Sequence, residues 1–173
     1  MELTWSSVSG PVGEITVVAG PRGVRAVAFD GPGEVLPEHP GAEPGGLAAE
    51  AAGQLGEYFA RERTEFDLPV DWDQLDGLRA HVLRTLVDLV PYGRTVSYKE
   101  LAELAGRPEA TRAVGSIMGS NPVPLIVPCH RVLASGGGLG GFGPGVPAKR
   151  RLLVLEGVLE PSLLELDLLA GDE

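Results

Sequence analysis

The chain has 173 residues, of which 43% are hydrophobic, and a formal net charge of −10 at pH 7. That length and apolar fraction suit one domain or two small ones and exclude a wholly disordered chain. No basic segment precedes an apolar stretch near Met1 and no apolar run is long enough to span a bilayer, so we expect a cytoplasmic protein without a membrane partner. The single cysteine, Cys129, excludes internal disulfides and cysteine-rich zinc sites, and we expect no metal.

The first part of the chain predicts a small sheet and a helix. Three runs rich in Val, Thr and Ile, separated by Gly and Pro, predict strands over residues 3–9, 14–18 and 23–29. The breakers within residues 30–46 predict a surface loop, and apolar periodicity predicts a helix over residues 47–63. Residues 64–76 are expected to form a short strand followed by a polar linker.

The second part of the chain is predicted to be mostly helical. Periodicity and breakers predict four helices, over residues 77–90, 98–106, 108–118 and 147–156. Asp76 is placed to cap the first helix, and Ser97 with Glu100 forms a capping box at the second. The second and third helices, joined by a short turn, form a candidate helix-turn-helix, which alone is a weak sign of DNA binding.

These elements predict two domains and a tail. We expect an α/β protein of the α+β kind, with a β-sheet-plus-helix domain over residues 1–76 and a mostly helical domain over residues 77–157. An acidic tail follows over residues 158–173, and no internal repeat is visible.

Charge is divided unevenly between these parts. Residues 1–76 carry 4 basic and 14 acidic side chains, residues 77–157 carry 10 and 5, and residues 158–173 carry 5 acidic ones alone. The acidic total disfavours nucleic acid as a partner, whereas the basic middle segment is suited to meeting phosphates. Charge scatter in an acidic protein explains the same counts equally well, so charge alone leaves both interpretations open.

One face of the helix that ends near Met118 is built of small residues around a single arginine. Gly115 and Gly119 lie on that face with Arg112, and glycine inside a helix costs about 1 kcal/mol relative to alanine. Close approach of another backbone, from DNA or from a neighbouring helix, would explain two such residues. Alternatively, Arg112 is a solvated surface residue and the glycines serve internal packing; the sequence leaves this open.

The chemistry of the chain is expected to centre on Cys129. A lone cysteine is commonly an inert core residue, but His130 and Arg131 follow this one directly. A thiol attacks as the thiolate, and a nearby His or Arg lowers the thiol pKa. Neighbours on an extended chain point to opposite faces, so contact between Cys129 and His130 requires a turn or a bridging water. Glu156, otherwise a surface helix residue, is a candidate for orienting His130.

These residues carry a resemblance to a known family. The run Pro-Cys-His-Arg-Val at residues 128–132, preceded by Asn-Pro-Val-Pro at residues 121–124, resembles the active-site motif of the O6-alkylguanine-DNA alkyltransferases, also called methylated-DNA–protein-cysteine methyltransferases. Further matches lie at residues 93–98, 112–115, 149–153 and 156–157. The resemblance is dense over residues 77–157 and implies that they form the domain that binds DNA and holds the active site. For the first domain, where only the strand–strand–helix layout matches, it implies a ribonuclease H-like fold.

The resemblance implies DNA repair by direct and irreversible alkyl transfer. Members of the family flip O6-alkylguanine out of duplex DNA and keep its alkyl group on a cysteine as a thioether, so each molecule acts once. Carried over, Cys129 is the acceptor, and His130 is a water-mediated base oriented by Glu156. Asn121 bridges the active-site turn, and Tyr98 donates a proton to the leaving guanine. We accordingly expect a monomer without a cofactor whose partner is duplex DNA carrying O6-alkylguanine, with O4-alkylthymine as a further candidate substrate.

The resemblance also implies how DNA is held. Arg112 is the finger that fills the gap left by the flipped base, its helix lies in the minor groove, and Tyr98 crowds the phosphate of the target nucleotide. Backbone carbonyls near Cys129 and Val132 read the guanine amino group. Further substrate or DNA contacts fall to Thr111, Ala113, Gly115, Met118, Ser135, Phe142 and Gly143. The family often has Tyr where Phe142 stands and Ser or Ala where Gly143 stands, so these positions are either neutral variants or signs of a wider pocket.

Three other classes of protein fit parts of the sequence. A non-catalytic lesion-binding protein of the alkyltransferase-like kind shares the fold but lacks the acceptor cysteine, so Cys129 argues against it. A transcriptional regulator built on the helix-turn-helix has no use for the Pro-Cys-His-Arg run. A cysteine hydrolase would turn over a small ester or peptide. The alkyltransferase interpretation accounts for all of these residues together.

Overall fold

The chain forms two compact units. The computed structural model describes residues 2–134 and 138–161; the first unit comprises the described residues up to Asp71 together with Pro161, and the second spans Trp72–Glu160. The predicted domain boundary, between residues 76 and 77, lies further along the chain than the observed division between Asp71 and Trp72. Trp72 already belongs to the second unit, where its ring centroid lies 5.1 Å from the guanidinium carbon of Arg84. The roles predicted for the domains stay predictions, and residues 162–173 of the expected acidic tail lie outside the described residues.

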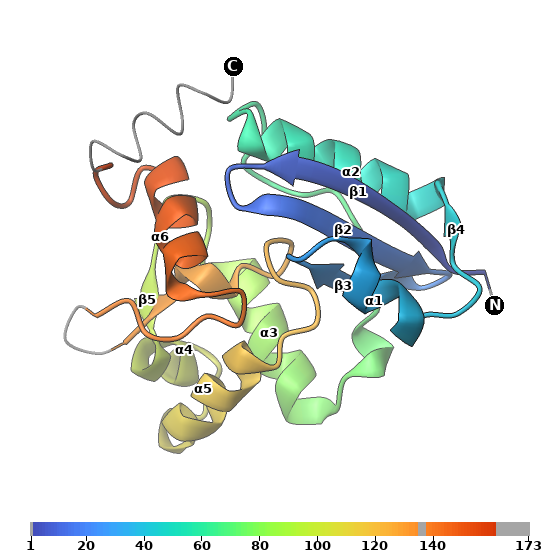
Figure 1. Cartoon of the computed structure of the whole chain (residues 1–173). Coiled ribbons are helices and arrows are strands. Elements are labelled where there is room, and N and C mark those ends of the chain that lie inside the picture. The colour runs from blue at the N-terminus through green and yellow to red at the C-terminus, as the bar shows by residue number, and fades with distance from the viewer. Residues whose placement is uncertain (1, 135–137, 162–173) are drawn as a thin grey trace. The chain divides into compact units, whose positions relative to one another are not determined.

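A four-stranded sheet forms the centre of the first unit. β1 (Thr4–Gly10), β2 (Gly13–Gly20) and β3 (Gly23–Ala28) pair antiparallel, which confirms the three predicted strands. The short β4 (Glu43–Pro44) lies parallel to β1, so the order is β3-β2-β1-β4. α2 (Gly46–Phe59) packs along β1 and β2 (Figure 1). Residues 15–19 of the central strand β2 are all buried, which places the core of this unit around it.

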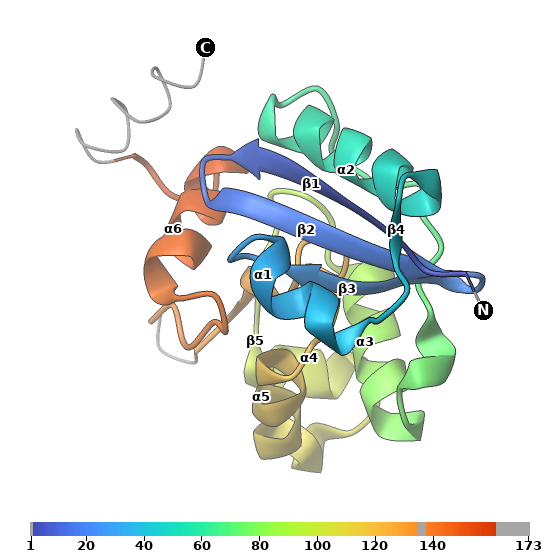
Figure 2. The ribbon, with the colours of Figure 1, turned by 45° about the vertical axis from the view of Figure 1, so that its right-hand side comes forward.

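The predicted surface loop over residues 30–46 is wrong in detail. This segment contains α1 (Pro32–Val35), a 3-10 turn at Leu36–Glu38 and β4. α1 lies beside β2 and β3 (Figure 2). Elements of one turn are too short to show a 3.6-residue periodicity, although Pro32 in the first helical turn is a common helix start.

Two further predictions for this unit are corrected. α2 ends at Phe59 rather than at residue 63, because Arg61 takes a left-handed φ of 63° that a helix does not accommodate. Residues 64–76 form no strand. They contribute one isolated bridge, between Val70 and Val24, and a 3-10 turn at Trp72–Gln74. The segment holds four Asp and the proline Pro69, and these residue types disfavour a longer strand.

Helices dominate the second unit. Its elements are α3 (Gly77–Leu89), β5 (Val96–Ser97), α4 (Tyr98–Leu104), a 3-10 turn at Pro108–Ala110, α5 (Thr111–Gly119), a 3-10 turn at Cys129–Arg131, β6 (Val132–Leu133) and α6 (Val146–Leu155). α3, α4 and α5 pack against one another (Figure 2). Both predicted caps are present: Asp76 accepts from the Arg79 backbone N–H at 3.1 Å, and Ser97 and Glu100 exchange side-chain-to-backbone bonds of 3.0 and 2.9 Å. None of the helices described is long and apolar enough to cross a bilayer.

The ends of two predicted helices change, and one strand pairing was not predicted. Residues 108–110 form a 3-10 turn, so α5 begins at Thr111, and α6 stops at Leu155 with Glu156 as its C-cap. α4 and α5 pack together, while the helix-turn-helix geometry itself stays a prediction. β5 and β6 pair in parallel, with Val96 opposite Val132. This pairing brings the start of α4, and with it Tyr98, beside the segment that follows Cys129.

Candidate functional site

Asn121 holds the segment before Cys129 in a tight, buried turn. Its side-chain nitrogen donates to the Val127 carbonyl at 3.0 Å, and its side-chain oxygen accepts from the Val123 backbone N–H, also at 3.0 Å. Between them Leu125 adopts a left-handed φ of 75°, a conformation that leucine rarely takes unless its surroundings stabilise it. Residues 125–127 are buried, as their apolar character predicts. Asn121 therefore bridges the two sides of the turn, the position that the family resemblance assigns to it.

Cys129 begins a 3-10 turn at the end of this segment and is only 5% exposed. Burial raises the pKa of the Cys129 thiol, and a hydrogen bond with the Asn121 side chain and the positive charge of Lys149 offset this only in part. The resting thiol therefore keeps its proton at neutral pH. Attack by sulfur then requires a base that removes this proton.

His130 has the geometry of that base. The residue is fully buried, and its Nε2 lies 2.6 Å from Oε2 of Glu156. Burial lowers the pKa of His130 by more than the hydrogen bond and charge of Glu156 raise it, so the ring is neutral at pH 7. Its bond to a carboxylate assigns the single ring proton to Nε2. Nδ1 is then an acceptor, and among the described residues no group forms a hydrogen bond with it.

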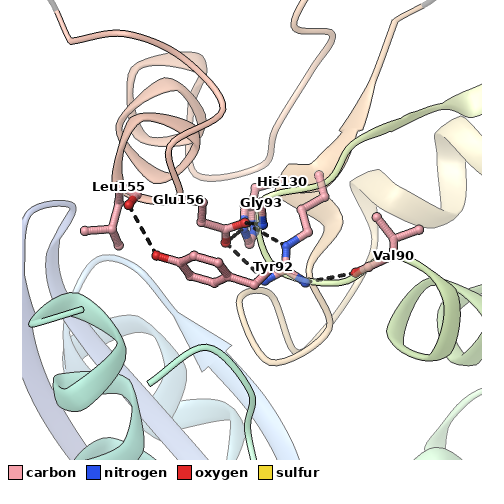
Figure 3. Close-up of polar contacts among 7 residues, drawn as sticks. Val90, Tyr92, Gly93, His130, Leu155 and Glu156 are labelled. Atoms are coloured by element: carbon pink, nitrogen blue, oxygen red, sulfur yellow. Dashed lines mark hydrogen bonds and ion pairs between the residues drawn. The ribbon is translucent and has the colours of Figure 1, made fainter. Parts of the chain in front are cut away.

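Glu156 is held as a carboxylate by several donors at once. Arg131 donates from Nε to Oε1 at 2.9 Å and from Nη2 to Oε2 at 3.1 Å, and the Gly93 backbone N–H donates to Oε1 at 3.1 Å. Burial raises the pKa of Glu156, but the hydrogen bonds and charges of His130 and Arg131 outweigh it and lower the pKa to about 2. Figure 3 shows His130 and Gly93 at the Glu156 carboxylate. The charge of Arg131 is thus neutralised by the same group that orients His130.

The turn between α3 and β5 supports this cluster. The Val90 carbonyl accepts from Nη1 of Arg131 at 2.9 Å, and the Tyr92 hydroxyl donates to the Leu155 carbonyl at 3.3 Å (Figure 3). The guanidinium carbon of Arg131 also lies 5.9 Å from the centroid of the Tyr92 ring. From its sequence position, Arg131 is expected only as a charge near the thiol. Its place in the core follows from the 3-10 turn, which turns Arg131 toward the end of α6.

Lys149 is the second residue whose part was missed. It lies in α6 and is fully buried, and its Nζ donates to the Val132 carbonyl at 2.6 Å and to the Gly141 carbonyl at 3.1 Å. Burial lowers the pKa of Lys149 to about 8, although the negative charge that Cys129 takes on as thiolate opposes the shift. A signal was present in the sequence, because Lys149 lies three and four residues before the buried Leu152 and Leu153 on the inner face of α6. The Val132 carbonyl, expected to read the guanine amino group, is thus already the acceptor of a bond from Lys149.

Tyr98 lies at the first position of α4, close to the loop that leads to α6. Its hydroxyl forms a hydrogen bond with the backbone of Gly141. Partial burial raises the pKa of Tyr98, against the smaller effect of that bond, and the charge of a Cys129 thiolate raises it further. The hydroxyl therefore carries its proton at neutral pH and can donate it.

The outer face of α5 is free of internal packing. Arg112 is exposed, and Thr111, Ala113 and Gly115 are partly exposed. A Cβ placed on Gly115 or Gly119 would meet no atom within 4 Å, so internal packing does not explain these glycines. Met118 differs from the other predicted contacts, because it is 7% exposed and lies with the buried Val114 and Ile117. The small residues around Arg112 leave room for an external backbone to approach.

The remaining predicted contacts lie near the loop before α6. Phe142 is partly buried and its carbonyl accepts from the Gly145 backbone N–H at 2.9 Å. Gly143 is exposed, and a Cβ there would meet nothing within 4 Å. Ser135 lies outside the described residues. Across residues 2–134 and 138–161, no three His, Cys, Asp or Glu side chains gather into a group that could hold a metal ion.

Two family models match the chain. Residues 3–72 match the ribonuclease-like domain of 6-O-methylguanine DNA methyltransferase, and residues 78–158 match its DNA binding domain. Among curated proteins, the methylated-DNA–protein-cysteine methyltransferase of Mycolicibacterium paratuberculosis is 48% identical over 118 residues, which are 68% of this chain and 70% of the relative. The human protein of the same name is 32% identical over 168 residues, covering 90% and 81%.

Solved structures give the same result. The O6-methylguanine methyltransferase of Mycobacterium tuberculosis superposes with a TM-score of 0.77 at 37% identity, over 95% of this chain and 99% of that one. The M. tuberculosis protein OGT in complex with DNA gives a TM-score of 0.76 at 36% identity, over 96% and 99%. The α+β architecture predicted from the sequence is therefore confirmed.

Proposed function

This chain belongs to the 6-O-methylguanine DNA methyltransferase family, and from that premise we propose that Cys129 accepts the alkyl group of O6-alkylguanine in duplex DNA. The protein repairs methylated DNA by direct transfer to a cysteine of its own, and Cys129 is the single cysteine in the sequence. The product is a thioether, so each molecule acts once. The observation that carries the proposal is the buried, neutral His130 next to Cys129, with Nε2 bound to Glu156 and Nδ1 left as an acceptor.

The transfer is a substitution at the alkyl carbon. His130 Nδ1 takes the proton of Cys129 through a bridging water, and the thiolate sulfur attacks the carbon bonded to guanine O6. The sulfur–carbon bond forms as the carbon–oxygen bond breaks, and the bonding electron pair leaves with the guanine. Tyr98 gives a proton to the leaving guanine. The proton held by His130 then returns through solvent to the Tyr98 phenolate, so the thiol has lost one proton, the guanine has gained one, and the step balances without a cofactor.

Duplex DNA is the partner, and α5 is the element proposed to meet it. Its exposed Arg112 is flanked by residues small enough for a DNA backbone to come close, which supports Arg112 as the side chain that fills the gap left by a flipped base. Unstacking a base costs a few kcal/mol, which this insertion and the contacts in the base pocket offset. Because one molecule acts on one base, we expect a monomer, and we expect it in the cytoplasm.

The base pocket is proposed to include the loop of Phe142 and Gly143. Gly143 is exposed and has no side chain, so only its backbone N–H is available to the guanine O6. Phe142 offers a ring surface without a hydroxyl. With no side chain at Gly143, we propose that the pocket also accepts alkyl groups larger than methyl, and O4-alkylthymine is a second candidate substrate.

The mass of the intact protein after incubation with duplex DNA carrying O6-methylguanine tests the proposal. We expect a stoichiometric gain of one methyl group, about 14 Da, located on Cys129 by peptide mapping and missing from Cys129→Ala. A protein that binds this DNA but gains no mass would instead be a lesion-binding protein. Release of many product molecules per protein would indicate a turnover enzyme such as a cysteine hydrolase.

A further inference from the structure

Lys149 is a fully buried cation whose partners are backbone carbonyls. Burying an ammonium group is costly unless its donors form hydrogen bonds, and lysine is almost never fully buried without a partner. Here Nζ donates to the Val132 and Gly141 carbonyls at 2.6 and 3.1 Å. No carboxylate in the described part of the chain forms an ion pair with it. The buried ammonium group of Lys149 therefore serves to join these two carbonyls.

The two carbonyls belong to different parts of the site. Val132 is the first residue after the 3-10 turn that Cys129 begins. Its pairing with Val96 in β5 fixes its position. Gly141 lies in the loop of residues 138–145, which leads into α6 and contains five glycines. Glycine loses more conformational freedom on ordering than any other residue, so this loop has little order of its own. A link from Lys149 to Gly141 fixes the loop against the strand beside the thiol.

Other bonds hold the loop near the same place. The Ala134 backbone N–H donates to the Gly138 carbonyl at 3.0 Å, and the Tyr98 hydroxyl bonds to the backbone of Gly141. Gly140 has a φ of +74°, and a Cβ on it would lie 2.9 Å from the Tyr98 hydroxyl oxygen and 3.3 Å from the Ala134 nitrogen. The loop is thus folded closely around Tyr98, and Lys149 is the charged group that ties it to β6.

We infer that Lys149 is a positioning residue for the proposed transfer, whose ammonium group fastens the loop of residues 138–145 to β6 beside Cys129. The loop is then formed before the base arrives, so binding of the base does not have to order it. A displacement of about 1 Å in such a positioning element can slow a reaction about 10²-fold. The inference rests on the proposed function, because the loop is useful in this way only if an alkylated base is presented to Cys129.

The test is Lys149→Met, which keeps a long apolar stem and removes all three donors and the charge. We expect the maximal rate of methyl transfer at saturating DNA to fall about 10²-fold. The affinity for undamaged duplex DNA should stay within about twofold of the wild type. Lys149 is fully buried, so its loss removes no contact with a phosphate. Hydrogen exchange of the peptide covering residues 138–145 should become faster. Leu104→Met, which places the same methionine side chain at an exposed apolar position of α4, is the control and should change neither the maximal rate nor the exchange.

A second variant keeps the inference testable if Lys149→Met does not fold. Gly140→Ala disturbs the loop at the Tyr98 contact without touching Lys149, and it should reproduce the slower transfer and faster exchange. The inference is overturned if Lys149→Met transfers methyl at the wild-type maximal rate, or if transfer slows while exchange of the loop is unchanged. Loop exchange is measured without DNA. If the wild-type protein does not methylate Cys129, the proposed function is wrong. If loop exchange is the same in Lys149→Met and the wild type, the positioning role of Lys149 is wrong, so the two failures are distinguishable.

Discussion

At the scale of single residues, the site depends on one carboxylate with two duties. Glu156 accepts a hydrogen bond from the proton-bearing Nε2 of His130 and also neutralises the charge of Arg131. All three side chains are buried. A buried cation without its counter-ion is strongly destabilising, and a buried histidine without its acceptor loses its preferred tautomer. Stability and proton transfer are therefore coupled through Glu156.

Glu156→Gln should impair both of these duties at once. The amide cannot neutralise Arg131, so we expect a loss of about 3–5 kcal/mol in the free energy of unfolding. It also leaves His130 badly oriented as a base, which should slow methyl transfer by about 10²–10⁴-fold in the molecules that stay folded. Urea unfolding and single-turnover transfer at low temperature measure the two effects. Glu160→Gln, at an exposed position just after α6, should change neither, and equal effects in the two variants would contradict the assignment.

The pH dependence of stability follows from the same cluster. The pKa of Glu156 is about 2 in the folded protein, below the value of about 4.3 of a free glutamate, so the folded state prefers the carboxylate. This contribution is complete above about pH 4.3 and is lost as the pH falls toward 2. His130 acts in the same direction, because burial lowers its pKa and the unfolded chain takes up a proton first as the pH falls below about 6.5.

We therefore expect the free energy of unfolding to decline from about pH 6.5 downward, with a steeper decline below about pH 4.3. Denaturant unfolding at closely spaced pH values measures both ranges. Glu156→Gln should remove the share of the steeper decline that Glu156 contributes, and His130→Gln the share of the upper one that His130 contributes. A wild-type stability that stays constant between pH 6.5 and 3 would show that neither group titrates as described.

At the scale of elements, α5 carries a glycine that serves neither its internal packing nor its own stability. Gly115 lies in the middle of the helix, where alanine would be better by about 1 kcal/mol, and a Cβ there would meet nothing within 4 Å. Gly115→Ala should therefore raise the free energy of unfolding by about 1 kcal/mol and weaken binding to duplex DNA. Gly53→Ala is the control, because this exposed glycine of α2 also has no atom within 4 Å of a Cβ. It should stabilise the protein and leave DNA binding unchanged.

Arg112 is the second test of this element. If it fills the gap left by a flipped base, Arg112→Ala should slow methyl transfer from duplex DNA. A free O6-methylguanine base has no stack to fill, so transfer from the free base should proceed at the wild-type rate and serves as the internal control. Quenched single-turnover assays with the two substrates measure the ratio. Wild-type repair of duplex DNA by Arg112→Ala would refute the role given to this side chain.

The elements also show what the sequence can and cannot predict. The caps at Asp76 and Ser97 were predictable, because each needs only a few neighbouring residues. The short helix at Pro32 was missed, since one turn has no periodicity to detect. Pairing of His130 with Glu156 was expected from the need for a group that orients the histidine and from the family resemblance, because nothing local predicts it across 26 positions of sequence. Arg131 and Lys149 were hidden because a charged side chain is normally assigned to the surface, and only the fold brings carbonyls and a carboxylate to them.

At the scale of the whole molecule, the net charge of −10 conceals a basic segment. Residues 77–157 hold ten basic side chains, of which Arg131 and Lys149 are buried, so eight remain that can reach phosphates. Each phosphate that is neutralised releases counterions and contributes about −0.9 to the slope of log K against log salt concentration. Eight contacts set a ceiling, with a slope no steeper than about −7.

We expect binding to undamaged duplex DNA to weaken with salt along a straight line shallower than this ceiling. The segment also carries the exposed acidic residues Asp88, Glu100, Glu103 and Glu109, which keep some of the eight cations from the phosphates. Fluorescence anisotropy at several salt concentrations gives the slope directly. A slope steeper than about −7 would require basic residues outside the segment to take part, and Arg22, Arg61 and Arg63 would be the ones to test. Binding that does not change with salt would mean that phosphates contribute little and that the base pocket alone holds the DNA.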